Sequence, residues 1–357
     1  MRISFGTRTL ATSFDRRRNS LNAIRLALAV LVIISHSWAI GDFGPEPELG
    51  GAHLGTWAVL GFFAISGYLI VASRLNSSAT RFYRARAMRI MPGFTVCLVL
   101  IAAVLAPVST LVNGTWSGVS AMSFIVRNIA LYPPHMAQDG ISDTLGSVPY
   151  ERVWDGSLWT LFWEACCYVM VGIAVSVAPR RALLPSVIVS LILVTAISVA
   201  GKVGALPLPG IGERVIPLLA TFLAGAFVFL AADVLPLSKL SLFVAGAWVA
   251  VAVALGLVQQ IGALPIAFLL MSLGSRREAS RIGGKYDISY GLYIYAWPVQ
   301  QLLVLLLGGA GGVWVLIGGS ILVSAPIAFL SCVLVEQPSL RLVKPGRPSR
   351  PAVGPAP

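Results

Sequence analysis

The chain has 357 residues, of which 57% are hydrophobic and only 11% are charged, and its mean hydropathy is +0.84. Soluble domains are about 45–50% apolar and about 25% charged. The composition therefore excludes a soluble globular enzyme, a disordered chain and a disulfide-stapled secreted domain. The net charge of +12 suits either a nucleic-acid-binding protein or a membrane protein with basic cytoplasmic loops, so the positions of the charges must decide.

Continuous apolar runs predict an all-α, polytopic membrane protein. A helix of about 20 residues crosses a bilayer, whereas the strands of a membrane β-barrel alternate polar and apolar residues. Ten spans are predicted, at 21–40, 55–73, 88–107, 157–178, 182–200, 213–232, 239–256, 260–274, 286–307 and 312–335. Residues 1–20 form a basic segment before a membrane domain at 21–336. Residues 337–357 form a Pro- and Arg-rich tail that we expect to be disordered.

The basic residues gather on one side of the predicted membrane. With a cytoplasmic N-terminus, 21 of the 26 Lys and Arg residues lie on the cytoplasmic side. This asymmetry obeys the positive-inside rule and places both termini in the cytoplasm. It also explains the net charge without nucleic acid as a partner. We therefore expect a multi-pass protein of the cytoplasmic membrane, in contact with lipid, whose longest outer loop is 108–156.

The first predicted span carries two polar side chains, Arg25 and His36. Such groups are costly within a bilayer and are functional candidates. Eleven helical steps turn about 1100°, so both side chains face one side of the helix, about 16 Å apart along its axis. This arrangement suits the two ends of a long substrate, or two substrates that enter from opposite sides. The alternatives are that Arg25 reaches the lipid headgroups and that His36 only bonds a neighbouring helix.

A third polar group, Glu164, lies in the fourth predicted span. It follows the outer start of that span by about seven residues, and His36 precedes the outer end of its own span by about four. Because the two helices run in opposite directions, the two side chains are predicted at similar depth. A His–Glu pair would orient the imidazole, which could then take a proton from a hydroxyl nucleophile.

Arg86 and Arg89 lie where a basic loop, 74–87, is predicted to become the third span. Guanidinium groups bind phosphates well, so these arginines could hold a phosphate-bearing donor in the cytoplasm. The alternative is that they serve topology alone. The sequence contains no P-loop, dinucleotide-binding glycine motif, zinc-protease motif or serine-hydrolase elbow. We expect neither a metal site nor a tightly bound cofactor.

Six stretches of the sequence, in this order, resemble motifs of the membrane acyltransferase-3 family. They run from Asn22 to His36, from Gly61 to Ile70, from Arg86 to Pro92, from Ser157 to Tyr168, from Ser289 to Tyr293 and from Glu336 to Pro338. The chain departs from the family at Asn22, where Asp is common, and at Ala296, where many members have a second histidine. A role for that second histidine is therefore not expected here.

The resemblance implies an integral membrane O-acyltransferase. Such an enzyme moves an acyl group, here expected to be acetyl, from cytoplasmic acyl-CoA to a hydroxyl of a cell-envelope or exported glycan or glycolipid. His36 matches the essential histidine of the family and Arg25 matches its partner arginine. We hypothesise that His36 is the general base and that Glu164 orients it or balances its charge. The residues expected to bind the donor or substrate are Arg25, Arg86, Arg89, Ser66, Trp159 and Tyr168.

Two rival functions remain open at this point. A glycolipid or polysaccharide transporter or flippase would also need buried charges and a long outer loop, but it would not need His36 and Glu164 at one depth. A receptor or sensor is a third reading, and the sequence shows no soluble signalling domain in its favour. The acceptor, the acyl chain length and the oligomeric state are not predicted.

Overall fold

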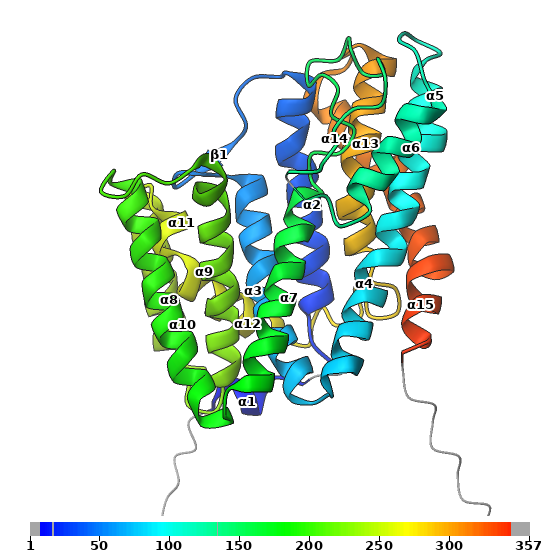
Figure 1. Ribbon diagram of the computed structural model, residues 1–357. Coiled ribbons are helices and arrows are strands. Elements are labelled where there is room, and N and C mark those ends of the chain that lie inside the picture. Colours follow the sequence, from blue (N-terminus) through cyan, green and yellow to red (C-terminus); the bar gives the residue numbers. More distant parts are fainter. Residues whose placement is uncertain (1–7, 16–17, 134, 344–357) are drawn as a thin grey trace, which may run out of the picture.

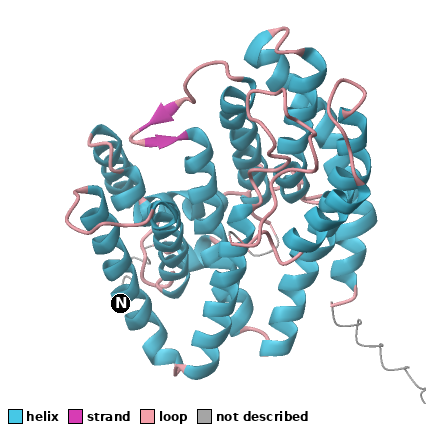
Figure 2. Cartoon of the chain, turned by 45° about the horizontal axis from the view of Figure 1, so that its top comes forward, coloured by secondary structure: helices cyan, strands magenta, loops and turns pink. Residues whose placement is uncertain are grey.

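The computed structural model describes residues 8–15, 18–133 and 135–343. Within these ranges the chain is a helical bundle with one two-stranded hairpin (Figures 1 and 2). The elements are α1 (Leu10–Ser13), α2 (Leu21–Gly41), β1 (Glu48–Leu49), β2 (Ala52–His53), α3 (Leu54–Leu75), α4 (Ala79–Leu100), the π-helix η1 (Ile101–Leu105), α5 (Ala106–Ser109), α6 (Gly118–Asn128), α7 (Trp159–Val177), α8 (Arg180–Lys202), α9 (Gly210–Leu230), α10 (Lys239–Ala254), α11 (Val258–Ile261), α12 (Ala263–Gly274), α13 (Ser289–Leu307), α14 (Gly312–Ser331), the π-helix η2 (Cys332–Glu336) and α15 (Gln337–Arg341).

Eight continuous helical stretches in the described ranges are long and apolar enough to cross a membrane. They are Leu21–Gly41, Leu54–Leu75, Ala79–Ser109, Trp159–Val177, Arg180–Lys202, Gly210–Leu230, Ser289–Leu307 and Gly312–Arg341. The other two predicted spans correspond to α10 and α12, which are apolar helices of 16 and 12 residues. The protein is thus a helical membrane protein, as predicted, and the count of ten crossings stays a prediction. α1 and the end of α15 lie at the same end of the bundle (Figure 1).

One predicted boundary is wrong. The basic stretch 74–87 is not a loop, because α4 begins at Ala79, where the Ser78 hydroxyl accepts a hydrogen bond from the Arg81 amide and caps the helix. The disordered tail at 337–357 stays a prediction: α15 covers its first five residues, and residues 344–357 lie outside the described ranges. Residues 1–7 and 16–17 of the predicted N-terminal segment also lie outside them.

Helices α3 and α9 pack with their backbones in contact. A Cβ atom at Gly67 would lie 2.0 Å from the carbonyl oxygen of Phe222, and one at Gly225 would lie 2.0 Å from that of Ala64. Only glycine fits at these two positions, and small residues allow such close packing of membrane helices. This contact fixes one face of α3 and leaves Ser66, beside Gly67, on the wall of a cavity.

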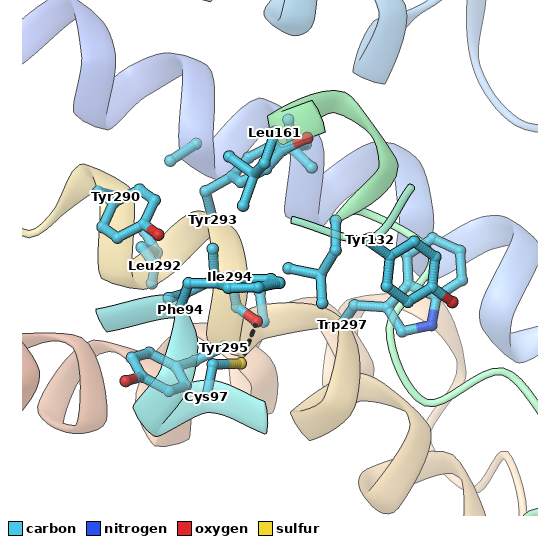
Figure 3. Close-up of a cluster of buried hydrophobic side chains, with 14 of the residues drawn as sticks. Phe94, Cys97, Tyr132, Leu161, Tyr290, Leu292, Tyr293, Ile294, Tyr295 and Trp297 are labelled. Atoms are coloured by element: carbon cyan, nitrogen blue, oxygen red, sulfur yellow. Dashed lines mark hydrogen bonds between the residues drawn. The ribbon is translucent and has the colours of Figure 1, made fainter. Parts of the chain in front are cut away.

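Helix α13 is the buried centre of the bundle. Its aromatic residues pack among side chains of α4 and α7, and the Cys97 thiol of α4 donates to the carbonyl oxygen of Ile294, 3.2 Å away (Figure 3). At the end opposite α1, Gln301 of α13 donates to the carbonyl oxygens of Tyr150 and Val153. The long loop between α6 and α7 is thereby tied to the bundle, and its Trp154 is completely buried.

Candidate active site

Six of the eight residues predicted for the site line one cavity of about 110 Å³. We call it the central cavity. They are Arg25, Ser66, Arg86, Arg89, Glu164 and Tyr168. These residues come from α2, α3, α4 and α7, so the fold brings together polar groups that are far apart in the sequence.

One carboxylate oxygen holds two of the predicted arginines. Asp287 Oδ2 lies 2.6 Å from Arg25 Nη1 and 2.9 Å from Arg89 Nη2. Burial favours a higher pKa for Asp287, but the two guanidinium groups, with hydrogen bonds from the Ser289 amide and hydroxyl, hold that pKa at about 2. Asp287 is therefore ionised at neutral pH. Arg25 does not reach toward lipid headgroups, because it is paired within the bundle.

The second acid at Arg89 is Glu336. Arg89 Nη1 lies 3.5 Å from Glu336 Oε2, and the Glu336 side chain is almost completely buried. Glu336 ends the π-helical turn η2, and such turns are common at functional sites. Arg89 thus bridges two acids from distant parts of the chain, and its position in the cavity is fixed.

Glu164 does not pair with His36. No hydrogen bond or ion pair joins these two side chains, both of which lie in the described ranges. Glu164 Oε1 instead accepts hydrogen bonds from the Ser66 hydroxyl, 2.9 Å away, and from the Tyr168 hydroxyl one helical turn along α7. The predicted pair is wrong because similar depth along two helices does not fix which way their side chains point.

Arg86 forms no ion pair within the described part of the chain, although Glu164 lines the same cavity. It makes no hydrogen bond or ion pair there, and its Nε atom is buried without a partner. Arg86 and Leu69 also line a larger cavity of about 710 Å³. We call this the vestibule. It lies between α1, α3, α4, α9 and the end of α15, and it meets the central cavity at Arg86.

His36 lies beyond the other end of the central cavity. Its ring packs edge-on against Trp297, with centroids 4.7 Å apart, and it does not line the cavity. Tyr293, one turn before Trp297 on α13, closes the cavity at that end. Its hydroxyl lies 2.6 Å from Thr160 Oγ1 and donates to the carbonyl oxygen of Ser157, 2.9 Å away.

The remaining predicted residue, Trp159, is absent from the lining of the central cavity. It is partly buried against the main apolar core. Three residues of the site were not predicted: Asp287, Glu336 and Tyr293. All three lie within two residues of the last two sequence motifs or inside them, and this proximity was the one available signal for them.

Comparisons with known proteins identify the family of the chain. The acyltransferase-3 profile, described as an acyltransferase domain, matches residues 18–335. The chain is 29% identical over 304 residues to an "O-acetyl transferase" of Shigella phage Sf6, covering 81% of this chain and 86% of that protein. It is 24% identical over 368 residues to "Nodulation protein 10" of Rhizobium leguminosarum bv. viciae, covering 91% and 94% of the two chains. No solved structure matches the chain. The chain therefore belongs to the acyltransferase-3 family and is a membrane acyltransferase.

Proposed function

We propose that the protein transfers an acyl group, with acetyl the expected one, from cytoplasmic acyl-CoA to a hydroxyl of a cell-envelope or exported glycan. The observation that carries this proposal is the unpaired Arg86 guanidinium at the junction of the two cavities. A partly buried guanidinium that forms no ion pair is suited to bind phosphate oxygens. The phosphates of coenzyme A supply such an anion next to an acyl thioester.

The two cavities suit the two parts of this donor. The vestibule, at about 710 Å³, is of the size of ordinary ligand pockets and takes the nucleotide, with Arg81 and Arg86 on its wall. The central cavity is narrower and takes the pantetheine arm. Arg25 and His36 are about 16 Å apart along α2, a span that an extended arm of this kind covers. In this arrangement the vestibule opens to the cytoplasm, on the inner face of the cytoplasmic membrane.

His36 is the general base in this proposal. A ring nitrogen of His36 takes the proton of the acceptor hydroxyl as the hydroxyl oxygen attacks the thioester carbonyl. A C–O bond forms, the C–S bond breaks, and the thiolate of coenzyme A leaves and takes up a proton. Because His36 does not line the cavity, side chains at this end, Tyr293 among them, must move for the thioester to reach the base. Glu164, which does not contact His36, holds Ser66 and Tyr168 on the cavity wall.

The acceptor is proposed from the relatives and from the membrane setting. The phage relative is named an O-acetyl transferase, which favours acetyl as the group and an oxygen as the acceptor atom. Glycans of the cell envelope present hydroxyl groups at the membrane face opposite the vestibule. The long loop between α6 and α7 lies at that end of the bundle (Figure 1), and it is placed to cover a bound glycan.

The proposal is tested with purified protein in sealed vesicles that contain envelope glycan and receive labelled acetyl-CoA. We expect free coenzyme A and an ester-linked label on the glycan in equal amounts. A transporter without acyl transfer would move the glycan across the vesicle membrane with no release of coenzyme A, and that result would refute the proposal.

A further inference from the structure

A third cavity lies at the end of the bundle opposite the vestibule. It has a volume of about 410 Å³ and lies between the end of α8, the start of α9 and α11. We call it the polar pocket. Its polar lining residues are Ser198, Lys202, Glu213, Arg214, Gln259 and Gln260. The central cavity and the vestibule share none of these residues, so the polar pocket is separate from the site described above.

Two nearly buried side chains in this pocket lack hydrogen-bond partners in the described part of the chain. Ser198 is 4% exposed and Gln260 is 9% exposed. Several buried helical serines donate to the carbonyl four residues before, as Ser272 and Ser320 do, but Ser198 does not. The hydroxyl of Ser198 is therefore available to a ligand.

Gln260 differs from the other five glutamines of the sequence in the hydrogen bonds of its side-chain amide. Each of the other five donates its side-chain amide to a backbone carbonyl oxygen. Those five are Gln138, Gln259, Gln300, Gln301 and Gln337. Gln260 makes no such bond, although all six lie in the described ranges. An amide that is both donor and acceptor, left free in a polar cavity, suits a hydroxyl-bearing ligand.

The charges of the pocket favour an anion. Lys202 and Arg214 form no ion pair within the described ranges, and Glu213 is the only acid on the lining. The lining is thus positive by one charge. Guanidinium and ammonium groups on one wall bind phosphate oxygens. Together with Ser198 and Gln260, they provide charge for a phosphate and hydrogen bonds for hydroxyl groups.

The polar pocket is connected to the surroundings of His36. Gln259, which lines the pocket, donates to the carbonyl oxygen of Gly51 in the hairpin, 2.8 Å away. The same hairpin leads into α3, where a Cβ atom on Gly55 would lie 3.6 Å from His36 Nε2. Figure 2 shows the hairpin at the edge of the bundle, directly before α3. A ligand in the pocket therefore lies on the same side of the protein as the proposed base.

We propose that the polar pocket binds a phosphorylated sugar or lipid headgroup, and that this group is the phosphate-bearing part of the acceptor. The assignment to the acceptor rests on the proposed function, but binding itself does not. A phosphate held by Lys202 and Arg214 would anchor the acceptor while a hydroxyl elsewhere on it reaches His36. The acceptor would then be a glycan that carries a phosphate, such as one attached to a lipid by a phosphoester.

The test uses the purified protein in phosphatidylcholine nanodiscs, with calorimetric titration of glucose 1-phosphate, glucose and inorganic phosphate. The wild type should bind glucose 1-phosphate at least tenfold more tightly than either of the other two probes. The K202Q/R214Q variant should bind it about tenfold more weakly. The matched control K239Q/R281Q removes one exposed Lys and one exposed Arg far from the pocket and should leave binding unchanged. S198A should weaken binding without loss of the fold.

Each outcome has a definite reading. The proposal that the pocket binds a phosphorylated group is refuted if glucose 1-phosphate shows no saturable binding. It is also refuted if K202Q/R214Q and K239Q/R281Q bind glucose 1-phosphate with equal affinity. If phosphatidylglycerol added to the nanodiscs competes with glucose 1-phosphate, the ligand is a lipid headgroup. If the binding of glucose 1-phosphate is unchanged, the ligand is a sugar phosphate. Acetyl-CoA turnover is measured on the same preparation. Turnover without binding refutes only the pocket, whereas binding without turnover refutes only the proposed function.

Discussion

Arg25 of α2 forms an ion pair with Asp287 at 2.6 Å, across 262 positions of sequence. The same carboxylate oxygen also pairs with Arg89, which in turn reaches Glu336. Two arginines and two acids thereby neutralise one another at one end of the central cavity. Arg86, which shares the cavity wall with Glu164, is left without an ion pair among the described residues, so we expect a bound anion to pair with Arg86.

Replacing Asp287 should disrupt this arrangement. In D287N, Arg25 and Arg89 lose their shared counterion while the side chain keeps its size. Both guanidinium groups then lose the acceptor that fixes their position, so we expect acyl transfer to fall at least tenfold. Steady-state transfer from acetyl-CoA measures this loss. D143N breaks an exposed pair with Arg152 and should change the rate less than twofold. Equal rates in the two variants would refute the role of Asp287.

Arg86 should govern donor affinity. R86Q removes the unpaired guanidinium, and we expect KM for acetyl-CoA to rise about tenfold or more, because a charged hydrogen bond contributes about 1.5–3 kcal/mol. Arg84 lies on the same helix and is exposed, so R84Q is the matched control and should leave KM unchanged. The comparison is made by titrating acetyl-CoA at fixed acceptor. A normal KM in R86Q would contradict the donor route through the vestibule.

Glu164 should stabilise the fold through the hydrogen bonds that its Oε1 atom accepts, and not only through its charge. In E164A the Ser66 and Tyr168 hydroxyls lose their acceptor, at a cost of about 1–3 kcal/mol for each buried orphan. In E164Q the amide oxygen can still accept both bonds. We therefore expect a clearly lower Tm for E164A than for E164Q in thermal unfolding in detergent. If both variants unfold at the same temperature, the hydrogen bonds to Ser66 and Tyr168 do not support the cavity.

Asp155, in the loop before α7, should make stability depend on pH. Burial raises its pKa to about 8, and hydrogen bonds from Ser157 only partly oppose this effect. A raised pKa means that the folded state favours the protonated form of Asp155. The contribution of this group to folding stability is therefore complete below about pH 4 and is lost as pH rises through about 8. We expect Tm of the wild type to fall between pH 5 and pH 8.

The D155N variant should show a flatter dependence, because its amide is neutral throughout and can still accept from Ser157. Thermal unfolding at pH 5, 6, 7 and 8 makes the comparison. D143N, whose carboxylate is exposed, should keep the slope of the wild type. A wild-type slope in D155N would show that another group is responsible.

The sequence predicted much of the fold and part of the site. Hydropathy located the helices because each long apolar run must be helical in a bilayer, and the motifs located six residues of the central cavity. The ion pairs of Asp287 and Glu336 were not predictable, because a partner more than 190 positions away leaves no local pattern. The depth argument placed His36 and Glu164 at similar levels, but side-chain direction depends on how α2, α3 and α7 are rotated about their axes.

The central claim is that His36 is the general base for transfer of the acyl group from a donor bound at Arg86. The most direct measurement is single-turnover transfer of labelled acetyl from acetyl-CoA to envelope glycan by H36A, with acetyl-CoA binding measured on the same sample. We predict that H36A binds acetyl-CoA with the affinity of the wild type and forms no glycan ester above the uncatalysed background. Ester formation by H36A at the wild-type rate would contradict the account.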